Sequence, residues 1–327
     1  MAQTPASTPP PSGYHRPVMT AEVVELLTPI GSGLVVDATF GGGGHTSALL
    51  AALPDAFVLA LDRDPDATSR VPVGTRVRLV TANFGDLARV LADPETVRWR
   101  REHDAYDPRG HDVAAVLFDL GVSSHQLDQA TRGFSYHKSG PLDMRMGPDA
   151  THSAADIVNG YGVADLADLF RRYGEEPHAR RIAEHLVRHR PFATTAELAA
   201  AVAEAVPAAA RRRRHPARRV FQAIRIAVND ELTVLATGLD HAIDQLRPGG
   251  RVVVIAYHSL EDRIVKRRLV AGATGCVCPP ELPVCVCDNV AELRLLTRSV
   301  RRPTAAEVET NPRARSARLR AAAKVAS

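Results

Sequence analysis

Several residue types are scarce in this chain of 327 residues, and each scarcity narrows what the protein can be. Aromatic residues make up only 5% of it and lysine occurs three times, yet 45% of the residues are hydrophobic and 24% are charged. These proportions exclude a fibre or a wholly disordered chain and are typical of a globular protein with a buried core. No apolar run reaches the roughly 18 residues of a membrane span, and the N-terminus lacks an export-signal pattern. We therefore expect a cytoplasmic protein.

Cysteine is also rare, and its four copies fall within one short segment. Cys276-x-Cys278 and Cys285-x-Cys287 bracket six residues that include three prolines. Because cytoplasmic thiols are kept reduced, this arrangement indicates a small zinc knuckle more than disulfides. The CxC spacing is less specific than CxxC, so unliganded thiols stay open as the alternative.

Most of the basic residues are arginines. Six arginines lie between Arg211 and Arg219, and eight lie between Arg294 and Arg320. Guanidinium groups make forked contacts with phosphate. The two basic zones predict a polyanionic partner, although a general preference for arginine on solvated surfaces would explain them equally well.

Short apolar runs bounded by turn residues alternate with helical patterns in the N-terminal third and return near the C-terminus. The runs are Leu34–Thr39, Phe57–Asp62, Val77–Thr81, Val113–Asp119 and Arg251–Tyr257. Near-continuous apolar strands separated by helices predict a parallel sheet with both faces covered. The expected fold class is therefore a doubly wound α/β sheet.

Residues between about 126 and 214 show helical periodicity and no strand pattern, which indicates an all-helical insertion. We expect a disordered Pro/Ser/Thr-rich leader over residues 1–12, a sheet domain formed by residues 13–128 and 216–327, and an inserted helical domain over residues 129–215.

Two further segments carry local predictions. Apolar residues from Phe221 to Leu246 recur at spacings of three and four, which predicts one long helix that ends at Arg247-Pro248-Gly249-Gly250. Residues 97–112 are polar and are expected to form a surface loop.

The first strand runs directly into four glycines, Gly41–Gly44, and a helix follows. This order lets a cofactor approach bare backbone N–H groups at a helix N-terminus. Asp62 ends the next strand about 20 residues later, where a carboxylate can accept both hydroxyls of an adenosine ribose. Asp64 precedes Pro65 and is better explained as a helix cap.

These features fit either a nicotinamide dinucleotide or S-adenosylmethionine. A dinucleotide fold needs a second mononucleotide-binding half, but here a helical segment follows the fourth strand. That strand ends at Asp119–Ser124, which places polar groups where a methyl acceptor would meet a sulfonium. A methyltransferase is favoured over a dehydrogenase, and a non-catalytic RNA-binding protein would not need the glycine loop together with Asp62.

Motifs spread over nearly the whole chain resemble one known family, the bacterial 16S ribosomal RNA (cytosine-N4)-methyltransferases, which are class I S-adenosylmethionine enzymes. The similar stretches are His15–Met19, Asp37–Thr46, Asp119–Ser124, Gln126–Asp128, Arg132–Ser135, Gly140–Met146, Ala154–Asn159, Tyr173–Glu176, Val220–Leu232, Tyr257–Arg268 and Asn311–Arg320.

The resemblance implies a methyltransferase domain interrupted by a helical substrate-recognition domain. The implied reaction is methyl transfer from S-adenosylmethionine to the N4 amine of a decoding-region cytidine in the small ribosomal subunit. Another nucleic-acid amine is the alternative substrate, and dimerisation is left open. The implied cofactor contacts are Gly43, Gly44, His45, Asp62, Phe84, Asp119 and Gln126.

Phe84 and Gln126 enter this set through the resemblance alone; Phe84 would otherwise be read as a core residue. The chain also departs from the family pattern, because His125 stands where proline is common. The segment after the fourth strand lacks the prolines and the aromatic residue of DNA amino-methyltransferases. Ser123 and His258 are our candidates for holding the amine, His258 being equally suited to a structural role. The transfer needs no metal, because the sulfonium leaves as a neutral thioether.

Overall fold

The computed structural model describes residues 17–68, 76–103, 106–107, 111–208, 215–278, 284, 286–287 and 289–326. The expected leader, residues 1–12, lies outside these residues, as do Arg211–Arg214 of the first basic zone and Cys285. None of the described helices has both the length and the apolar character of a membrane span.

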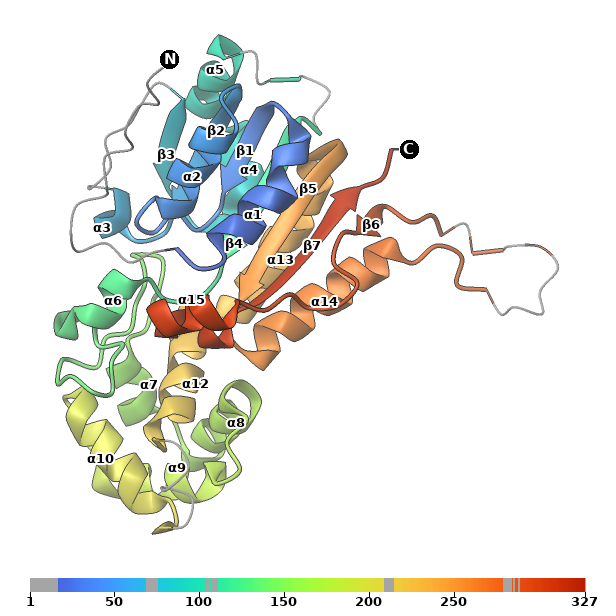
Figure 1. Cartoon of the computed structure of the whole chain (residues 1–327). Coiled ribbons are helices and arrows are strands. Elements are labelled where there is room, and N and C mark those ends of the chain that lie inside the picture. The colour runs from blue at the N-terminus through green and yellow to red at the C-terminus, as the bar shows by residue number, and fades with distance from the viewer. Residues whose placement is uncertain are drawn as a thin grey trace.

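A seven-stranded sheet runs through the upper half of the molecule in Figure 1, with strand order β3-β2-β1-β4-β5-β7-β6. The first five strands in this order are parallel, whereas β7 is antiparallel to both β5 and β6. The strand bounds are β1 (Gly33–Asp37), β2 (Ala56–Asp62), β3 (Val77–Thr81), β4 (Val113–Asp119), β5 (Leu246–Ala256), β6 (Leu293–Leu295) and β7 (Arg318–Lys324).

The five strands expected from the sequence are confirmed, but the expectation of a parallel sheet is wrong at the β7 and β6 edge. β6 has only three residues, too few for a periodic pattern to emerge. β7 reads RLRAAAK and contains no β-branched or aromatic side chain, so its sequence gives no strand signal.

Helices cover both faces of the sheet. Because side chains alternate along a strand, Leu34 and Val36 pack with one set of helices while Val35 packs with the other. One face is covered by α4 (Leu87–Ala92), α13 (Glu231–Gln245) and α14 (Ser259–Ala273), and the other by α1 (Thr20–Leu27) and α2 (Gly44–Ala52). Double burial is why the strands are apolar throughout.

A third core consists mainly of helices and includes buried residues from Phe134 to Val228. Its helices are α7 (Ala154–Gly160), α8 (Val163–Gly174), α9 (Ala179–His189), α10 (Thr195–Ala205) and α12 (Ala217–Asn229). We call this unit the helical cluster. It lies beyond the carboxyl ends of the parallel strands (Figure 1), so the two units meet at the edge where ligands of such sheets bind.

The single long helix expected from Phe221 to Leu246 is wrong. The chain forms two helices, and between them Asp230 has φ +47°, a left-handed conformation that Asp tolerates better than most residues. Residues of α12 are buried in the helical cluster and residues of α13 against the sheet. The break therefore divides one apolar stripe between two cores.

The polar stretch 97–112 is a loop only in part, because α5 (Pro94–Glu102) occupies its beginning. Asp93 caps this helix by accepting a hydrogen bond from the Thr96 N–H. The remaining helices are α3 (Pro65–Thr68), α6 (Ser124–Asp128) and α15 (Ala305–Thr310), with 3-10 turns at Thr28–Ile30, Phe84–Asp86, Ala130–Arg132 and Pro312–Ser316.

Candidate functional site

A cavity of 1020 Å³ opens at the carboxyl ends of the parallel strands. One wall comes from the segments that follow β1, β2, β4 and β5, and the other from the helical cluster and α13. Eight of the nine site residues predicted from the sequence line this cavity: Gly44, His45, Asp62, Phe84, Asp119, Ser123, Gln126 and His258. Gly43 is not among the lining residues.

Three of the four glycines in the loop are explained by their individual surroundings. Gly41 has φ +54° and lines the cavity, with no atom closer than 3.9 Å to the position of an added Cβ. A Cβ on Gly43 would lie 2.7 Å from the Phe40 ring, and one on Gly44 would lie 2.9 Å from Pro17. Gly43 and Gly44 thus let the loop pack closely against its own protein, while Gly41 leaves its backbone open to a ligand.

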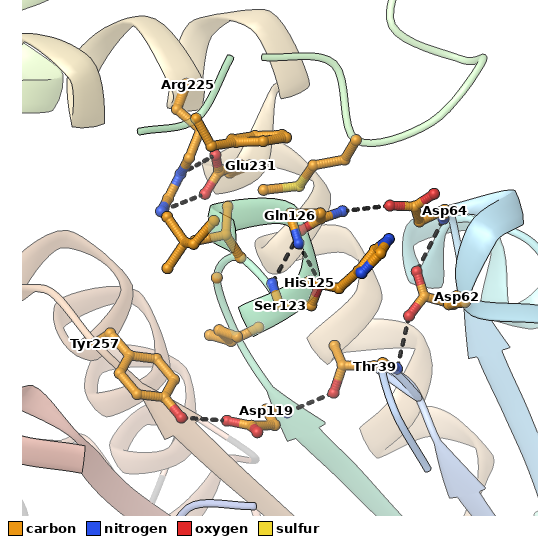
Figure 2. Close-up of a pocket in the computed structure, with 18 of the residues that line it drawn as sticks. Thr39, Asp62, Asp64, Asp119, Ser123, His125, Gln126, Arg225, Glu231 and Tyr257 are labelled. Carbon is orange, nitrogen blue, oxygen red and sulfur yellow. Dashed lines mark hydrogen bonds and ion pairs between the residues drawn. The ribbon is translucent and has the colours of Figure 1, made fainter. Parts of the chain in front are cut away.

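Asp62 connects this loop to the end of β2. Its carboxylate accepts hydrogen bonds from the backbone N–H of Gly41 at 2.7 Å and of Asp64 at 2.8 Å (Figure 2). Burial raises the pKa of Asp62 to about 6, although both hydrogen bonds act to lower it. Each carboxylate oxygen keeps a further lone pair, so the group can still accept hydrogen bonds from a diol in the cavity.

Asp119 lies at the end of β4, the middle strand of the sheet, and lines the cavity. The Tyr257 hydroxyl donates to its carboxylate at 2.7 Å, and its backbone N–H donates to Thr39 Oγ1 at 2.6 Å (Figure 2). Burial raises the pKa of Asp119, opposed by the nearby His45, and burial likewise raises that of Tyr257 well above its ordinary value. Asp119 is therefore held rigidly by the two neighbouring strand ends.

His45, in the first turn of α2, is buried and faces this carboxylate. Its Nε2 lies 3.4 Å from Asp119 Oδ2, and neither ring nitrogen has a hydrogen-bond partner among the described residues. Burial lowers the pKa of His45 although the Asp119 charge acts to raise it. An unsatisfied buried imidazole in a cavity wall points to a ligand that would complete its hydrogen bonding.

Ser123 and Gln126 form a reciprocal capping box at the start of α6. Ser123 Oγ accepts from the Gln126 N–H at 3.2 Å, and Gln126 Oε1 accepts from the Ser123 N–H at 2.9 Å. The Gln126 amide also donates to Asp64 at 2.8 Å, as Figure 2 shows. The capping box is complete even though His125 stands between these residues where the family commonly has proline. Asp64 additionally accepts from the Asp66 N–H at 3.1 Å, as expected for a helix cap.

Phe84 has contacts on both the core and the cavity side. Its ring meets Phe118 edge to face with centroids 5.4 Å apart, and it also lines the cavity. Gly238 of α13 lies so close to it that an added Cβ would be 2.6 Å from the ring. A role in packing is thus evident for Phe84, and its exposed side is available to a ligand.

His258 caps α14 and is paired with an acid of the same helix. Its Nδ1 accepts from the Glu261 N–H at 3.4 Å, and its Nε2 lies 3.1 Å from Glu261 Oε1. Burial acts to raise the pKa of Glu261, but His258 and Arg225 lower it, and the net shift is downward. The structural role that the sequence left open for His258 is therefore present.

Arg225 and Glu231 line the same cavity and were missed by the sequence analysis. They form a two-pronged ion pair across the break between α12 and α13, with both N–O distances 2.8 Å (Figure 2). Both lie in the stretch Val220–Leu232 that carries the family resemblance, but their pairing spans the helix break at Asp230, which the sequence analysis did not predict. Tyr257 and Glu261 were likewise missed as individual site residues, although both lie in a stretch that carries the family resemblance.

The strand order with an antiparallel β7, the glycine loop after β1 and the acid that ends β2 together define a class I S-adenosylmethionine-dependent methyltransferase. The sequence comparisons give the family. The chain belongs to the MraW methylase family, whose family model matches residues 12–325.

Two curated relatives have the same printed name, ribosomal RNA small subunit methyltransferase H. The protein of Thermomicrobium roseum is 48% identical over 97% of this chain and 95% of its own length. The protein of Geobacter sulfurreducens is 49% identical over 95% of this chain and 99% of its own length. A solved methyltransferase of Streptococcus mutans in complex with SAH is 11% identical, with a TM-score of 0.38 over 93% of this chain and 97% of that one.

The cofactor is S-adenosylmethionine, and the residues present fit it. The open backbone at Gly41, the fixed carboxylate of Asp62 and the unsatisfied ring of His45 all border one cavity. These groups suit a nucleoside with a ribose diol, whose hydroxyls can donate to a carboxylate.

Asp37, which ends β1 behind the glycine loop, provides a test of the electrostatics at this edge. It is fully buried, accepts from the Thr46 hydroxyl at 2.6 Å, and burial raises its pKa to about 6. Because this pKa exceeds that of the unfolded chain, the folded protein binds more protons between about pH 4 and 6. The charged form therefore destabilises the protein above pH 6, and this penalty disappears as the pH falls.

When the pH is lowered from 7 to 5, we expect the free energy of unfolding of the wild type to rise by about 1 kcal/mol relative to that of Asp37→Asn. Urea unfolding of the cofactor-free proteins measures it, with the exposed Asp55→Asn as the control variant. A difference that stays constant over this range would contradict the raised pKa.

Proposed function

We propose that this protein transfers a methyl group from S-adenosylmethionine to the N4 amine of a cytidine in the decoding region of 16S ribosomal RNA, acting in the cytoplasm on the small ribosomal subunit. The observation that carries the proposal is the shared cavity. Its sheet wall holds the groups suited to the methyl donor, and its opposite wall offers Phe134, Tyr136 and Phe221 of the helical cluster. The names of the two relatives, ribosomal RNA small subunit methyltransferase H, are the basis for proposing RNA of the small subunit as the substrate.

The volume and lining of the cavity are consistent with two ligands. At 1020 Å³ it lies at the upper end of the roughly 300–1,000 Å³ range of ligand pockets. Aromatic rings on the wall opposite the donor can stack against a base that has left the RNA stack. A single-stranded ribosomal segment allows this unstacking at low cost.

For the cofactor, we propose contacts from Gly44 and His45, with Gly43 shaping the loop that carries them and Asp62 accepting the ribose hydroxyls. Phe84 would cover the adenine, and Asp119 and Gln126 would complete the pocket. Asp62 and Asp119 support this assignment because both carboxylates are held in place, that of Asp62 by the backbone N–H groups of Gly41 and Asp64 and that of Asp119 by the Tyr257 hydroxyl. Gly43 would act indirectly, by letting the loop pack against Phe40.

Cytosine N4 is a poor nucleophile, because its lone pair is delocalised into the ring. The bound donor supplies an electrophilic methyl group that departs from a neutral thioether. The protein must therefore hold the amine in line and accept a hydrogen bond from its N–H, a positioning effect worth up to about 7–11 kcal/mol in the best intramolecular cases. We propose that Ser123 and His258, beside Asp119, hold the amine.

Phosphate contacts would come from arginines at the rim of the cavity. Arg218 is exposed and lines the cavity, and the exposed Arg219 follows it on α12. Arg219 Nη1 lies 3.9 Å from Glu176 Oε2, and part of the second basic zone is more fully engaged within the protein. Its internal ion pairs are Arg301 with Glu25, Arg313 with Asp128, and Arg318 and Arg320 with Asp262.

The proposed reaction is tested by incubating the protein with labelled methyl donor and either free 16S RNA or undermethylated small subunits. We expect label in N4-methylcytidine after nucleoside digestion and mass spectrometry.

Asp62→Ala should bind S-adenosylmethionine roughly 10- to 100-fold more weakly in calorimetry, because it loses charge-assisted hydrogen bonds. Asp55→Asn should bind like the wild type. Label on another nucleoside, or undiminished binding by Asp62→Ala, would refute the respective assignment.

Ser123 needs variants that separate its cap from its proposed contact with the amine. Ser123→Ala should lose about 1 kcal/mol of stability with the cap. Ser123→Asn retains a capping oxygen but displaces the hydroxyl, so we expect near-normal stability and cofactor affinity with kcat lowered about 10- to 100-fold. Ser123→Thr should retain both functions. Wild-type kcat in Ser123→Asn would leave Ser123 with a capping role alone.

The two rim arginines predict a change in salt dependence. Arg218→Gln/Arg219→Gln should bind small-subunit RNA more weakly and reduce the slope of log K against log salt by about 1.4, that is ~0.7 for each lost single-strand phosphate contact. The matched control is Arg98→Gln, an exposed arginine of α5 that does not line the cavity. Equal slopes for the double variant and the control would exclude these two arginines from the RNA interface.

A further inference from the structure

The segment between α14 and β6 brings together cysteines that the methyltransferase site does not use. The Sγ atoms of Cys276, Cys278 and Cys287 all lie within 4.8 Å of one another, and none of these residues lines the cavity. The described chain on either side of the cysteines extends away from the sheet, at the far end of α14 (Figure 1). Cys285 completes the sequence pattern but lies outside the described residues, so the inference rests on the other three.

The sulfur spacing matches ligands of one tetrahedral ion. Cys276 Sγ and Cys287 Sγ are 3.8 Å apart, far more than the ~2.05 Å of a disulfide bond. Two thiolates bound at ~2.3 Å to a tetrahedral zinc ion are separated by ~3.8 Å. The Sγ atoms of Cys276 and Cys287 are thus already at the distance that a shared ion requires.

Backbone N–H groups point at two of the sulfurs in a reciprocal pattern. The Val277 N–H donates to Cys287 Sγ at 3.4 Å, and the Val286 N–H donates to Cys278 Sγ at 3.3 Å. The middle residue of each CxC motif therefore donates to a cysteine of the other motif. Such donors stabilise negative charge on sulfur, as outer-sphere hydrogen bonds do around metal-bound ligands.

Apolar burial does not explain the shape of this segment. Val277, Val284, Val286 and Val290 are 62%, 69%, 72% and 82% exposed, so their side chains contribute little to any core. The base of the segment is fixed by Asn289, whose amide donates to the carbonyls of Thr274 and Gly275. A structure of this size without a core generally needs a cross-link such as a metal ion.

We propose that Cys276, Cys278 and Cys287 bind one Zn²⁺ ion as thiolates. On binding, each thiol releases its proton to solvent and forms a sulfur–zinc bond, with no change of oxidation state. The ion acts as a structural cross-link that orders the connection into β6, which pairs with β7 at the edge of the sheet. This site is separate from the methyl-transfer reaction and does not depend on the proposed function.

The full-length protein, purified without chelator, tests this directly. Elemental analysis should find about one zinc ion per chain. Cys276→Ser/Cys287→Ser should lower zinc to background, whereas Val286→Ala, which keeps all four sulfurs and the Val286 N–H, should retain it. Wild-type protein reconstituted with Co²⁺ should give the visible absorption of a tetrahedral thiolate site, a result that does not require any cysteine variant to fold.

Wild-type protein with reduced thiols that neither contains zinc nor takes up added Zn²⁺ would overturn the proposal. So would intramolecular disulfides detected by mass spectrometry of the protein as purified. Calorimetry with S-adenosylmethionine on the same samples keeps the two proposals distinguishable, because loss of zinc should leave cofactor binding unchanged.

Discussion

Burial of carboxylates at one edge of the sheet is the constraint around which the rest of the site is arranged. Asp37, Asp62 and Asp119 end three strands of the parallel sheet, and burial raises the pKa of each. None of the three forms an ion pair with a described lysine or arginine; they are held instead by hydrogen bonds from backbone N–H groups and hydroxyls. When ionised, these carboxylates give the cavity wall a negative charge, which favours a cationic ligand such as a sulfonium and disfavours the phosphates of a dinucleotide. Within the described residues a second nucleotide-binding half is also lacking, so electrostatics and topology independently favour a sulfonium donor over a dinucleotide.

The second constraint is the connection between the sheet and the helical cluster. Asn229, the last residue of α12, accepts a hydrogen bond from the Met146 N–H and donates to the Met144 carbonyl, both at 2.8 Å. The Asn229 carbonyl accepts from Arg63, which follows β2. Together with the Arg225–Glu231 pair, these contacts place the helical cluster over the strand ends. The wall proposed for the base is therefore fixed relative to the wall proposed for the cofactor.

The sequence predicts the cofactor half of the molecule better than the remainder, and the reason is physical. The buried strands, the glycine loop and Asp62 lie close together along the chain, so local pattern and turn chemistry reveal them. The helix break at Asp230 separates residues of α12, which pack in the helical cluster, from residues of α13, which pack against the sheet, and this tertiary packing is not visible in the local sequence. Similarly, β7 forms a strand by pairing with β5 and not because of its own β-propensity. Phe84 and Gln126 needed the family resemblance, because an isolated Phe or Gln carries no local signal.

The residues proposed to hold the amine show most clearly what the sequence alone cannot decide. Ser123 and His258 each accept a backbone N–H as helix caps, so their presence in the sequence is explained before any substrate is considered. Ser123 Oγ keeps one lone pair beyond the cap, but it is a neutral acceptor. A hydrogen bond to a charged acceptor is roughly twice as strong as one to a neutral acceptor, but burial raises the pKa of Asp119 and so works against its charged form. Asp119 already accepts a hydrogen bond from the Tyr257 hydroxyl and faces the His45 ring. The assignment of the amine to Ser123 and His258 therefore stays a proposal, because a cap and an amine-binding group carry the same signal in the sequence.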